Sequence, residues 1–168
     1  MQNADKWIQD LNLMPLPEEG GMYREIYRSQ ELITQAALPK RFTGDRCYAT
    51  SIYYLLKYPE FSAFHRLKQE EIWHFYDGQA LTLHIIDLQG NYAQKMMGRN
   101  IDNGEVLQHV VYAGQLFAAM PTYKDSYSLV GCTVAPGFEF TDLEIPSRKV
   151  LLNTYPQHKD TIMQFTHP

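Results

Sequence analysis

Short hydrophobic runs fill the middle of the chain and predict β-strands rather than helices. Aromatic and β-branched residues are concentrated at residues 22–29, 47–56, 72–76, 80–86, 105–111 and 126–134. Turn-forming residues separate these runs, as at Asp77-Gly78. The runs follow one another too closely for a helix to lie between each pair, which argues against a parallel βαβ sheet. The pattern therefore predicts an all-β fold, an antiparallel sandwich or barrel.

Helical patterns are confined to the two ends of the chain. Asn3 is suited to an N-cap position, and apolar residues recur at helical spacing from Trp7 to Leu11. We therefore expect an N-terminal helix over about residues 3–13. In the last segment, about residues 142–168, hydrophobic residues are grouped behind prolines, and proline is tolerated at the first position of a helix. We expect short C-terminal helices there.

The composition is that of one globular domain. The chain has 168 residues, of which 45% are hydrophobic and 20% are charged, enough to bury a sizeable core. We expect the barrel to occupy about residues 20–140 of a single domain. The 15 basic and 19 acidic residues give a formal charge of −4, which argues against nucleic acid as a partner because phosphate binding needs a basic surface. Since no apolar run approaches the roughly 20 residues that span a bilayer, we expect no membrane partner.

The cysteines and the first residues indicate the compartment. Cys47 and Cys132 lie far apart and form no CxxC pair. The opening residues, MQNADKWIQD, are too polar for a signal peptide. We therefore expect reduced thiols and a cytoplasmic location. Cys132 falls within the apolar run SLVGCTV, where we expect a buried core thiol.

The stretch at residues 62–78, SAFHRLKQEEIWHFYDG, holds the candidate chemistry. Residues two apart on a strand share a face, so Glu71 lies on the same side as Trp73. If the strands on either side of a turn at residues 68–69 pair, His65 and Glu71 point into one apolar enclosure. Such a pair can act as a general base, as a metal site or as a ligand-orienting pair. The alternative is that both are hydrogen-bonded polar groups at a strand end.

The same stretch resembles the first signature of the cupins, G-x5-H-x-H-x3-4-E-x6-G. His65 falls in the first histidine position, and Glu71-x6-Gly78 fits the end of the signature. Leu67 occupies the second histidine position. One of the usual metal-binding side chains is therefore replaced by hydrocarbon.

The second cupin signature, G-x5-P-x-G-x2-H-x3-N, resembles the segment around Gly114. Tyr112 replaces its proline, Phe117 its histidine and Pro121 its asparagine. Together with Leu67, Phe117 removes two of the four side chains that usually hold a cupin metal.

The match is closer to one uncharacterised branch, the cupin_5 group of RmlC-like cupins. The segments that resemble this branch are residues 17–29, 62–78, 127–138 and 148–156. The resemblance implies a double-stranded β-helix, the cupin or jelly-roll barrel, commonly a homodimer, with a pocket inside. The branch has no established reaction, so the resemblance implies more about the fold than about the function.

Our preferred interpretation is a protein that binds a small molecule in the barrel pocket. Trp73, Phe75 and Phe117 would give the pocket apolar walls, with His65 and Glu71 as convergent polar groups. Phenylalanine in a metal-ligand position makes the pocket drier and better suited to a ring or acyl group. The expected ligand is sugar-like, or aromatic or acidic.

A metal-free sugar epimerase or isomerase is the first alternative. The dTDP-keto-sugar epimerases resemble this chain in having a histidine base in a barrel pocket. His65 would be the general base, Glu71 would orient it, and Tyr27 would be the acid. Arg24 would hold an anionic group of the ligand. Arg66 is the other candidate for that role, although, as the next residue of the strand, it faces the opposite side from His65.

A metal-dependent cupin enzyme is the second alternative, with His65 and Glu71 as the ligands. Protein sites for transition metals use three or more protein ligands, and the two matched positions supply one imidazole and one carboxylate. We therefore expect no tightly bound metal and no other cofactor.

Overall fold

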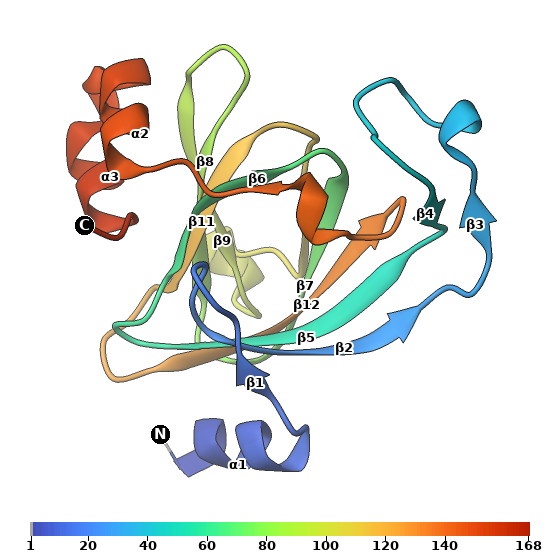
Figure 1. Cartoon of the computed structure of the whole chain (residues 1–168). Coiled ribbons are helices and arrows are strands. Elements are labelled where there is room, and N and C mark those ends of the chain that lie inside the picture. Colours follow the sequence, from blue (N-terminus) through green and yellow to red (C-terminus); the bar gives the residue numbers. More distant parts are fainter. Residues whose placement is uncertain (1) are drawn as a thin grey trace.

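Two antiparallel sheets lie face to face and form the body of the protein (Figure 1). The computed structural model describes residues 2–168. Over these residues, one sheet has six strands in the order β1 (Met14–Pro15), β2 (Met22–Arg28), β5 (Thr50–Lys57), β12 (Tyr127–Ala135), β7 (Glu70–Gly78) and β10 (Gln108–Val111). The facing sheet, in the same described range, has five strands in the order β13 (Leu143–Glu144), β6 (Ser62–Leu67), β11 (Leu116–Pro121), β8 (Leu81–Ile86) and β9 (Tyr92–Met97). A short pair, β3 (Leu32–Ile33) and β4 (Arg46–Cys47), extends to one side of the barrel (Figure 1).

The all-β prediction is confirmed, and each of the six hydrophobic runs overlaps a strand. Outside the six runs lie the two-residue strands β1, β3 and β13, then β6, which the sequence predicts separately, and the six-residue strands β9 and β11. In β9 polar residues interrupt the sequence YAQKMM, and β11, LFAAMP, contains alanine and proline, which have low strand propensity. Both strands pair with β8, one on each side. Pairing in the tertiary structure, rather than local propensity, therefore makes them strands.

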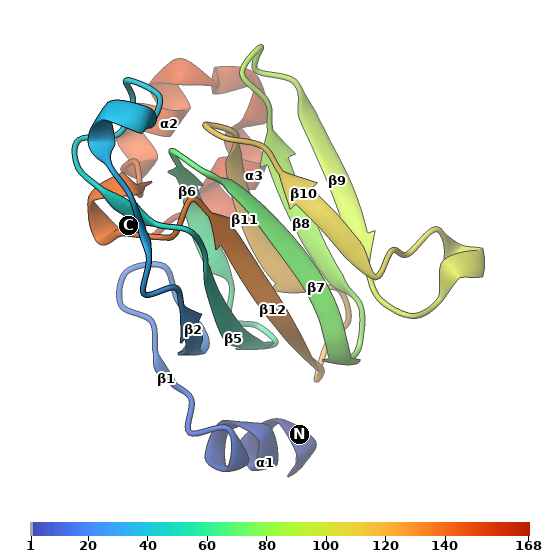
Figure 2. The ribbon, with the colours of Figure 1, turned by 90° about the vertical axis from the view of Figure 1, so that its right-hand side faces the viewer.

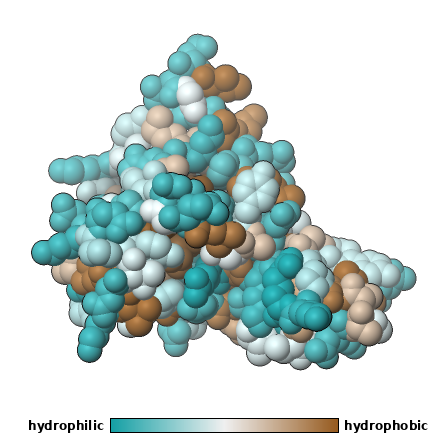
Figure 3. All heavy atoms as spheres, turned by 90° about the horizontal axis from the view of Figure 1, so that it is seen from above, coloured by the Kyte–Doolittle hydropathy of each residue, from teal (hydrophilic) through white to brown (hydrophobic). Residues whose placement is uncertain are grey.

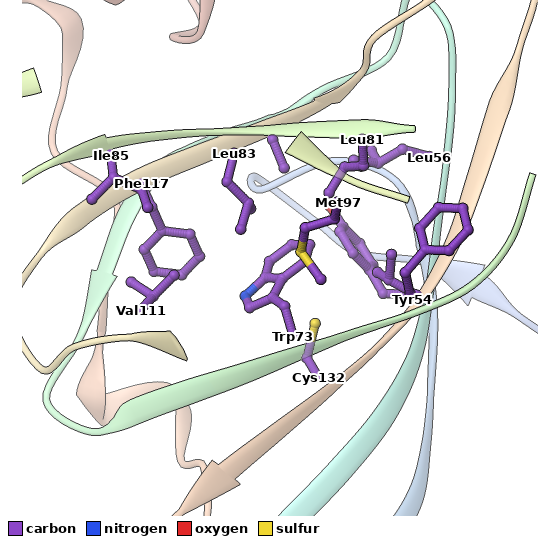
Figure 4. Packing of buried hydrophobic residues seen from close by; sticks show 13 residues of the cluster. Tyr54, Leu56, Trp73, Leu81, Leu83, Ile85, Met97, Val111, Phe117 and Cys132 are labelled. Carbon is purple, nitrogen blue, oxygen red and sulfur yellow. The ribbon is translucent and has the colours of Figure 1, made fainter. Parts of the chain in front are cut away.

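The core lies between the two sheets (Figure 4). Leu83 of β8 faces Trp73 and Cys132 on the opposite sheet (Figure 4). Leu81 and Ile85 of the same strand belong to the same cluster, with Ile85 near Phe117 (Figure 4). Because successive residues of a strand face opposite sides, each strand contributes every second side chain to this layer. Burying a large apolar side chain stabilises a fold by about 1.5–3 kcal/mol, so this layer holds the sheets together.

The N-terminal helix α1 (Gln2–Asp10) packs against the outer face of the six-stranded sheet, at one end of the molecule (Figures 1 and 2). Trp7 lies against the cluster that contains Leu55 and Leu129. Its indole Nε1 also donates a 2.9 Å hydrogen bond to Oδ2 of Asp77. The predicted N-terminal helix is therefore confirmed, and its tryptophan attaches it to the sheet. The helix ends at Asp10 instead of near residue 13, and Asn3 lies within the helix, not at the expected N-cap position.

The C-terminal helices α2 (Arg148–Thr154) and α3 (Lys159–Gln164) lie on the outer side of the five-stranded sheet (Figure 2). Their apolar side chains and those of the sheet form one buried cluster, composed of Phe64, Ile86, Leu116, Ala118, Leu151, Ile162 and Phe165. The predicted short C-terminal helices are confirmed. The remaining short turns of 3-10 helix are η1 (Gln35–Ala37), η2 (Ile101–Asn103), η3 (Phe140–Asp142) and η4 (Pro156–His158).

On the face shown in Figure 3, hydrophilic side chains separate the hydrophobic ones. Cys47 and Cys132 are free thiols and both are buried. The burial of Cys132 agrees with the expectation from its apolar run. Among the helices of residues 2–168, none is long and hydrophobic enough to cross a membrane.

Candidate functional site

A cavity of about 260 Å³ lies between the two sheets. Its apolar and aromatic walls are Leu16, Tyr23, Ile52, Tyr54, Leu67, Trp73, Val134, Phe138, Phe140 and Leu143. Its polar and thiol-bearing lining residues are Glu19, Glu25, Arg28, Thr50, His65, Glu71 and Cys132. A groove of about 530 Å³ beside the C-terminal helices is larger, but neither His65 nor Glu71 lines it. Because ligand sites combine apolar walls with a few convergent polar groups, the smaller cavity is the candidate site.

His65 and Glu71 both line this cavity, but they come from opposite sheets. The predicted pairing of their two strands is wrong, because β6 pairs with β11 and β13, and β7 with β12 and β10. The chain crosses between the sheets at residues 68–69, where Nε2 of the buried Gln69 donates a 2.6 Å hydrogen bond to Oδ2 of Asp142. The inner faces of the sheets meet, so the two side chains still converge.

The hydrogen bonding of His65 determines which ring nitrogen is basic. Its Nδ1 lies 2.7 Å from the carbonyl oxygen of Ala63, which can only accept. Nδ1 therefore carries a proton, and Nε2 has the lone pair when the ring is neutral. Nε2 lies 3.9 Å from Oε1 of Glu19. Phe117, directly opposite on β11, packs its ring 4.0 Å from the imidazole between centroids.

Glu71 has a buried carboxyl group in which one oxygen makes no hydrogen bond within the described structure. It is 7% exposed, and its Oε2 has no hydrogen-bond partner among the residues that the structure describes. Burial raises the pKa of Glu71 from 4.5 to about 7, while His65 lowers this pKa and Glu19 raises it. Near neutral pH the carboxyl group is therefore protonated in a fraction of the molecules. A group in that state can both donate and accept a proton.

Glu19 is a cavity residue that the sequence interpretation missed. It is 9% exposed and accepts a 2.8 Å hydrogen bond from the Ser62 hydroxyl. It precedes Gly20, where the φ of +104° and the close approach of the Phe61 carbonyl oxygen leave no room for a Cβ atom and so require glycine. The signal that could have found Glu19 is its place in the segment PEEGGMYREIYRS, at residues 17–29.

Tyr54 and Cys132 are further cavity residues that sequence reasoning did not select. The Tyr54 hydroxyl donates a 2.8 Å hydrogen bond to the carbonyl oxygen of Gly20, and its ring lies edge-on to Trp73 at 5.9 Å. Burial raises the pKa of the Tyr54 hydroxyl and that of the Cys132 thiol well above their ordinary values. Cys132 therefore remains a thiol at neutral pH and is not an activated nucleophile.

Of the three predicted aromatic wall residues, Trp73 lines the cavity and the other two lie in the core. Phe75 is 7% exposed and follows Trp73 by two residues, about 7 Å further along β7. Phe117 is 1% exposed and contributes its ring to the packing around His65. The prediction that Phe75 and Phe117 form walls of the cavity is therefore wrong. Their strands continue past the cavity into the packed layer between the sheets.

Strand β2 brings Tyr23, Glu25 and Arg28 to the cavity and leaves Arg24 and Tyr27 outside it. Arg24 is exposed, and its Nη1 donates a 3.0 Å hydrogen bond to the carbonyl oxygen of Leu11, just after α1. The register of β2 against β5 shifts between Glu25 and Tyr27, so Tyr27 is 54% exposed and Arg28 faces the cavity instead. The predicted cavity positions of Arg24 and Tyr27 are therefore wrong.

Arg66 also lies outside the cavity. Its side chain forms two hydrogen bonds of 2.8 Å with the carboxylate of Glu144 and lines a separate groove. Alternation along β6 explains this, because Arg66 follows His65 and faces the other side. The predicted position of Arg66 at the ligand-binding cavity is therefore wrong.

The basic residue at the cavity, Arg28, is already engaged by acceptors. Its guanidinium forms hydrogen bonds of 3.1 and 2.9 Å with the Glu25 carboxylate and of 2.8 Å with Glu139. It also donates to the carbonyl oxygen of Phe138 at 3.1 Å. Two carboxylates therefore surround one guanidinium at this edge of the cavity.

Two facing antiparallel sheets around a cavity that contains a histidine and carboxyl groups define a cupin barrel. The family model of the Cupin superfamily (DUF985), Cupin_5, matches residues 5–146, so the chain belongs to this family. The family recognised from the sequence is thereby confirmed. A search of curated proteins found no significant match.

Solved structures agree with this assignment. A protein of Shewanella oneidensis is 39% identical, with a TM-score of 0.89, over 100% of this chain and 99% of that one. A hypothetical protein from Leishmania major is 33% identical, also with a TM-score of 0.89, over 98% and 99% of the two chains. Oxalate decarboxylase from Bacillus subtilis is 15% identical, with a TM-score of 0.56, over 92% of this chain and 37% of that one. This last likeness concerns the fold alone.

The residues at the usual cupin metal positions do not fit a metal ion. Leu67 and Phe117 provide no lone pair, which leaves His65 and Glu71. Across the described residues 2–168, no three His, Cys, Asp or Glu side chains are grouped so as to hold a metal ion. Since protein sites for transition metals use three or more protein ligands, this donor set does not match one.

Proposed function

We propose that this cupin binds a small organic molecule in the cavity between its sheets. The observation that carries the proposal is the convergence of Glu19, His65 and Glu71 in a cavity of about 260 Å³ with largely apolar walls. Small-molecule sites are typically apolar clefts of roughly 300 Å³ or more with a few polar groups that fix orientation. The volume therefore suits a ligand built around a single ring.

The walls and the polar groups indicate how such a ligand would lie. An apolar body would pack against Trp73 and Phe138, with a polar group directed toward His65. A sugar-like or aromatic ligand meets these requirements. An acidic ligand is the weakest of the three expected classes, because Glu19 and Glu71 would repel its carboxylate.

A thermal-shift screen of sugars and single-ring aromatic compounds tests the proposal. A ligand at about 100 times its Kd should raise the free energy of unfolding by about 2.7 kcal/mol. We expect the shift to disappear in His65→Ala, which removes the imidazole from the cavity. Circular dichroism of the unliganded variant would establish that it still folds.

His74→Ala is the matched control for this experiment. His74 lies on β7 and faces outward, where its Nδ1 is 2.7 Å from Nε2 of Gln108. Its removal should leave every ligand-induced shift unchanged. Shifts that persist in a folded His65→Ala protein, or a screen without any stabilising compound, would contradict binding in this cavity.

Proton transfer at carbon, as in isomerases and epimerases, is a second candidate function. Two observations favour it: the basic Nε2 of His65 lies in the cavity, and Glu71 has a pKa of about 7. His65 would take a proton from a carbon beside a carbonyl, leaving an enolate, and protonated Glu71 would return a proton to that carbon. Tyr27, the acid expected from the sequence, is replaced in this scheme by Glu71.

Isotope exchange distinguishes the second function from binding alone. A compound found in the screen is incubated with the protein in deuterium oxide. Uptake of deuterium at the carbon beside the carbonyl, lost in His65→Ala, would support proton transfer. A ligand that binds tightly and exchanges no faster than without protein would restrict the site to binding.

A further inference from the structure

Three of the polar groups that line the cavity, Glu19, His65 and Glu71, offer hydrogen-bond acceptors. The carboxyl group of Glu19 accepts from the Ser62 hydroxyl and retains further lone pairs, since a carboxylate offers about four acceptor sites. Nε2 of His65 is an acceptor when the ring is neutral, because Nδ1 donates to Ala63. Glu71 adds a second carboxyl group, with one oxygen unpartnered within the described structure. A ligand group that meets these three side chains must therefore donate hydrogen bonds.

The distance between two of these acceptors fits one bridging atom. Nε2 of His65 and Oε1 of Glu19 are 3.9 Å apart, too far for a direct hydrogen bond. A single atom with two N–H or O–H donors could lie about 2.9 Å from both. An ammonium group has three N–H donors, which leaves one for Glu71.

The charge balance of the cavity favours a cation over a neutral donor. Arg28 is shared between Glu25 and Glu139, so that edge carries one more negative than positive charge. Glu19 adds a further carboxylate beside His65, and Glu71 adds negative charge in those molecules in which it is ionised. Charges in a cavity with low-dielectric walls act more strongly on a ligand than the same charges do in water.

The aromatic walls are also suited to a cation. Tyr23, Tyr54 and Trp73 line the cavity beside these acceptors, with Phe138 and Phe140 toward the Arg28 edge. Aromatic faces attract ammonium groups by about 0.5–2 kcal/mol, depending on how completely water is removed. The same rings can pack against an apolar body attached to the amine.

We propose that the cavity selects a small amine with an apolar body, which binds as its ammonium ion between Glu19 and His65. This inference rests on the proposed binding function and names its ligand class. Selection arises because the ammonium group satisfies acceptors that a carboxylate would oppose and that a single hydroxyl proton would satisfy only in part.

Three probes of nearly equal shape test this selection: benzylamine, benzyl alcohol and benzoate. Their Kd values are measured by isothermal titration calorimetry at about pH 8, where Glu71 is largely ionised and an alkylamine is still protonated. We expect benzylamine to bind at least tenfold more tightly than benzyl alcohol, and benzoate to show no measurable binding.

Glu19→Gln tests the role of the carboxylate, since it keeps the side-chain shape and removes the charge. It should weaken benzylamine binding at least tenfold and change benzyl alcohol binding much less. Glu70→Gln is the matched control, because Glu70 is exposed on β7 and outside the cavity. Its benzylamine affinity should equal that of the unmodified protein.

The outcomes separate this inference from the function on which it rests. Equal or tighter binding of benzyl alcohol or benzoate would overturn the selection for amines and leave small-molecule binding intact. Undiminished benzylamine binding in Glu19→Gln would also overturn it. If none of the three probes binds, the inference fails, and a sugar that depends on His65 in the thermal-shift screen would still support the proposed function.

Discussion

Replacing Glu71 with glutamine should make the protein more stable at neutral and alkaline pH. The substitution keeps the size of the side chain and removes its titration. Burial raises the pKa of Glu71 to about 7 in the folded protein, against an ordinary value of 4.5. The folded state therefore holds this proton more tightly than the unfolded state does.

The direction and the size of the effect follow from this difference. The contribution of Glu71 to stability is fully present below about pH 4.5 and is lost as the pH rises through about 7. The two pKa values differ by about 2.5, which at about 1.4 kcal/mol for each tenfold change in proton affinity corresponds to about 3 kcal/mol. Glutamine stays neutral, so Glu71→Gln should lack this loss.

Urea denaturation from about pH 4 to about pH 9 measures the effect. The stability difference between Glu71→Gln and the unmodified protein should grow across this range by about 3 kcal/mol in favour of the variant. Comparing the two proteins at each pH cancels the titrating groups that do not interact with Glu71. The exposed neighbour Glu70, changed to glutamine, should produce no such growth. A difference that is constant with pH, or that falls, would refute the assignment of Glu71 as a buried carboxyl with a raised pKa.

Three other predictions follow from the fold and the family. Arg46→Ala should destabilise the protein by about 3 kcal/mol in urea denaturation, the lower end for a broken buried pair. It removes the hydrogen bonds of 2.6 and 2.7 Å to the buried Asp142, which keeps Lys68 at 3.4 Å and the hydrogen bond from Gln69. Arg66→Ala, at a partly exposed pair, should cost at most about 1 kcal/mol, and equal losses in the two variants would contradict this. Gly20→Ala should lower the melting temperature, since the added Cβ would collide with the Phe61 carbonyl oxygen at a φ of +104°; an unchanged melting temperature would argue against this turn. The family resemblance predicts a homodimer, so analytical ultracentrifugation should give a molar mass twice the 19.6 kDa of one chain. A monomer mass at micromolar concentration would exclude the dimer.

Alternation along single strands was enough to place part of the candidate site. Glu71 and Trp73 share a face of β7, and the cavity lies on that face. The same rule separates Arg66 from His65 on β6. These placements could be predicted because a period of two residues is a local property of any strand.

Other parts of the site depended on contacts between distant segments. Glu19 reaches the cavity because a turn after β1 brings it to Ser62, which is 43 residues away in the sequence. Arg28 replaces Tyr27 because β2 changes register against β5. Neither the turn nor the register shift produces a hydrophobic pattern in the local sequence. Counting alternate residues along β2 therefore selects Tyr27 instead of Arg28.

The all-β class, the short helices at the two ends and the membership of the cupin family could all be predicted from the amino-acid sequence. These follow from period-two patterning, turn residues and family segments spread along the chain, all of which are local or directly comparable. The folded domain was needed to show that His65 and Glu71 meet across two sheets instead of along a pair of strands. The folded domain also showed that Glu19 lines the same cavity. The way the two sheets meet depends on packing over the whole domain and not on the residues next to each side chain.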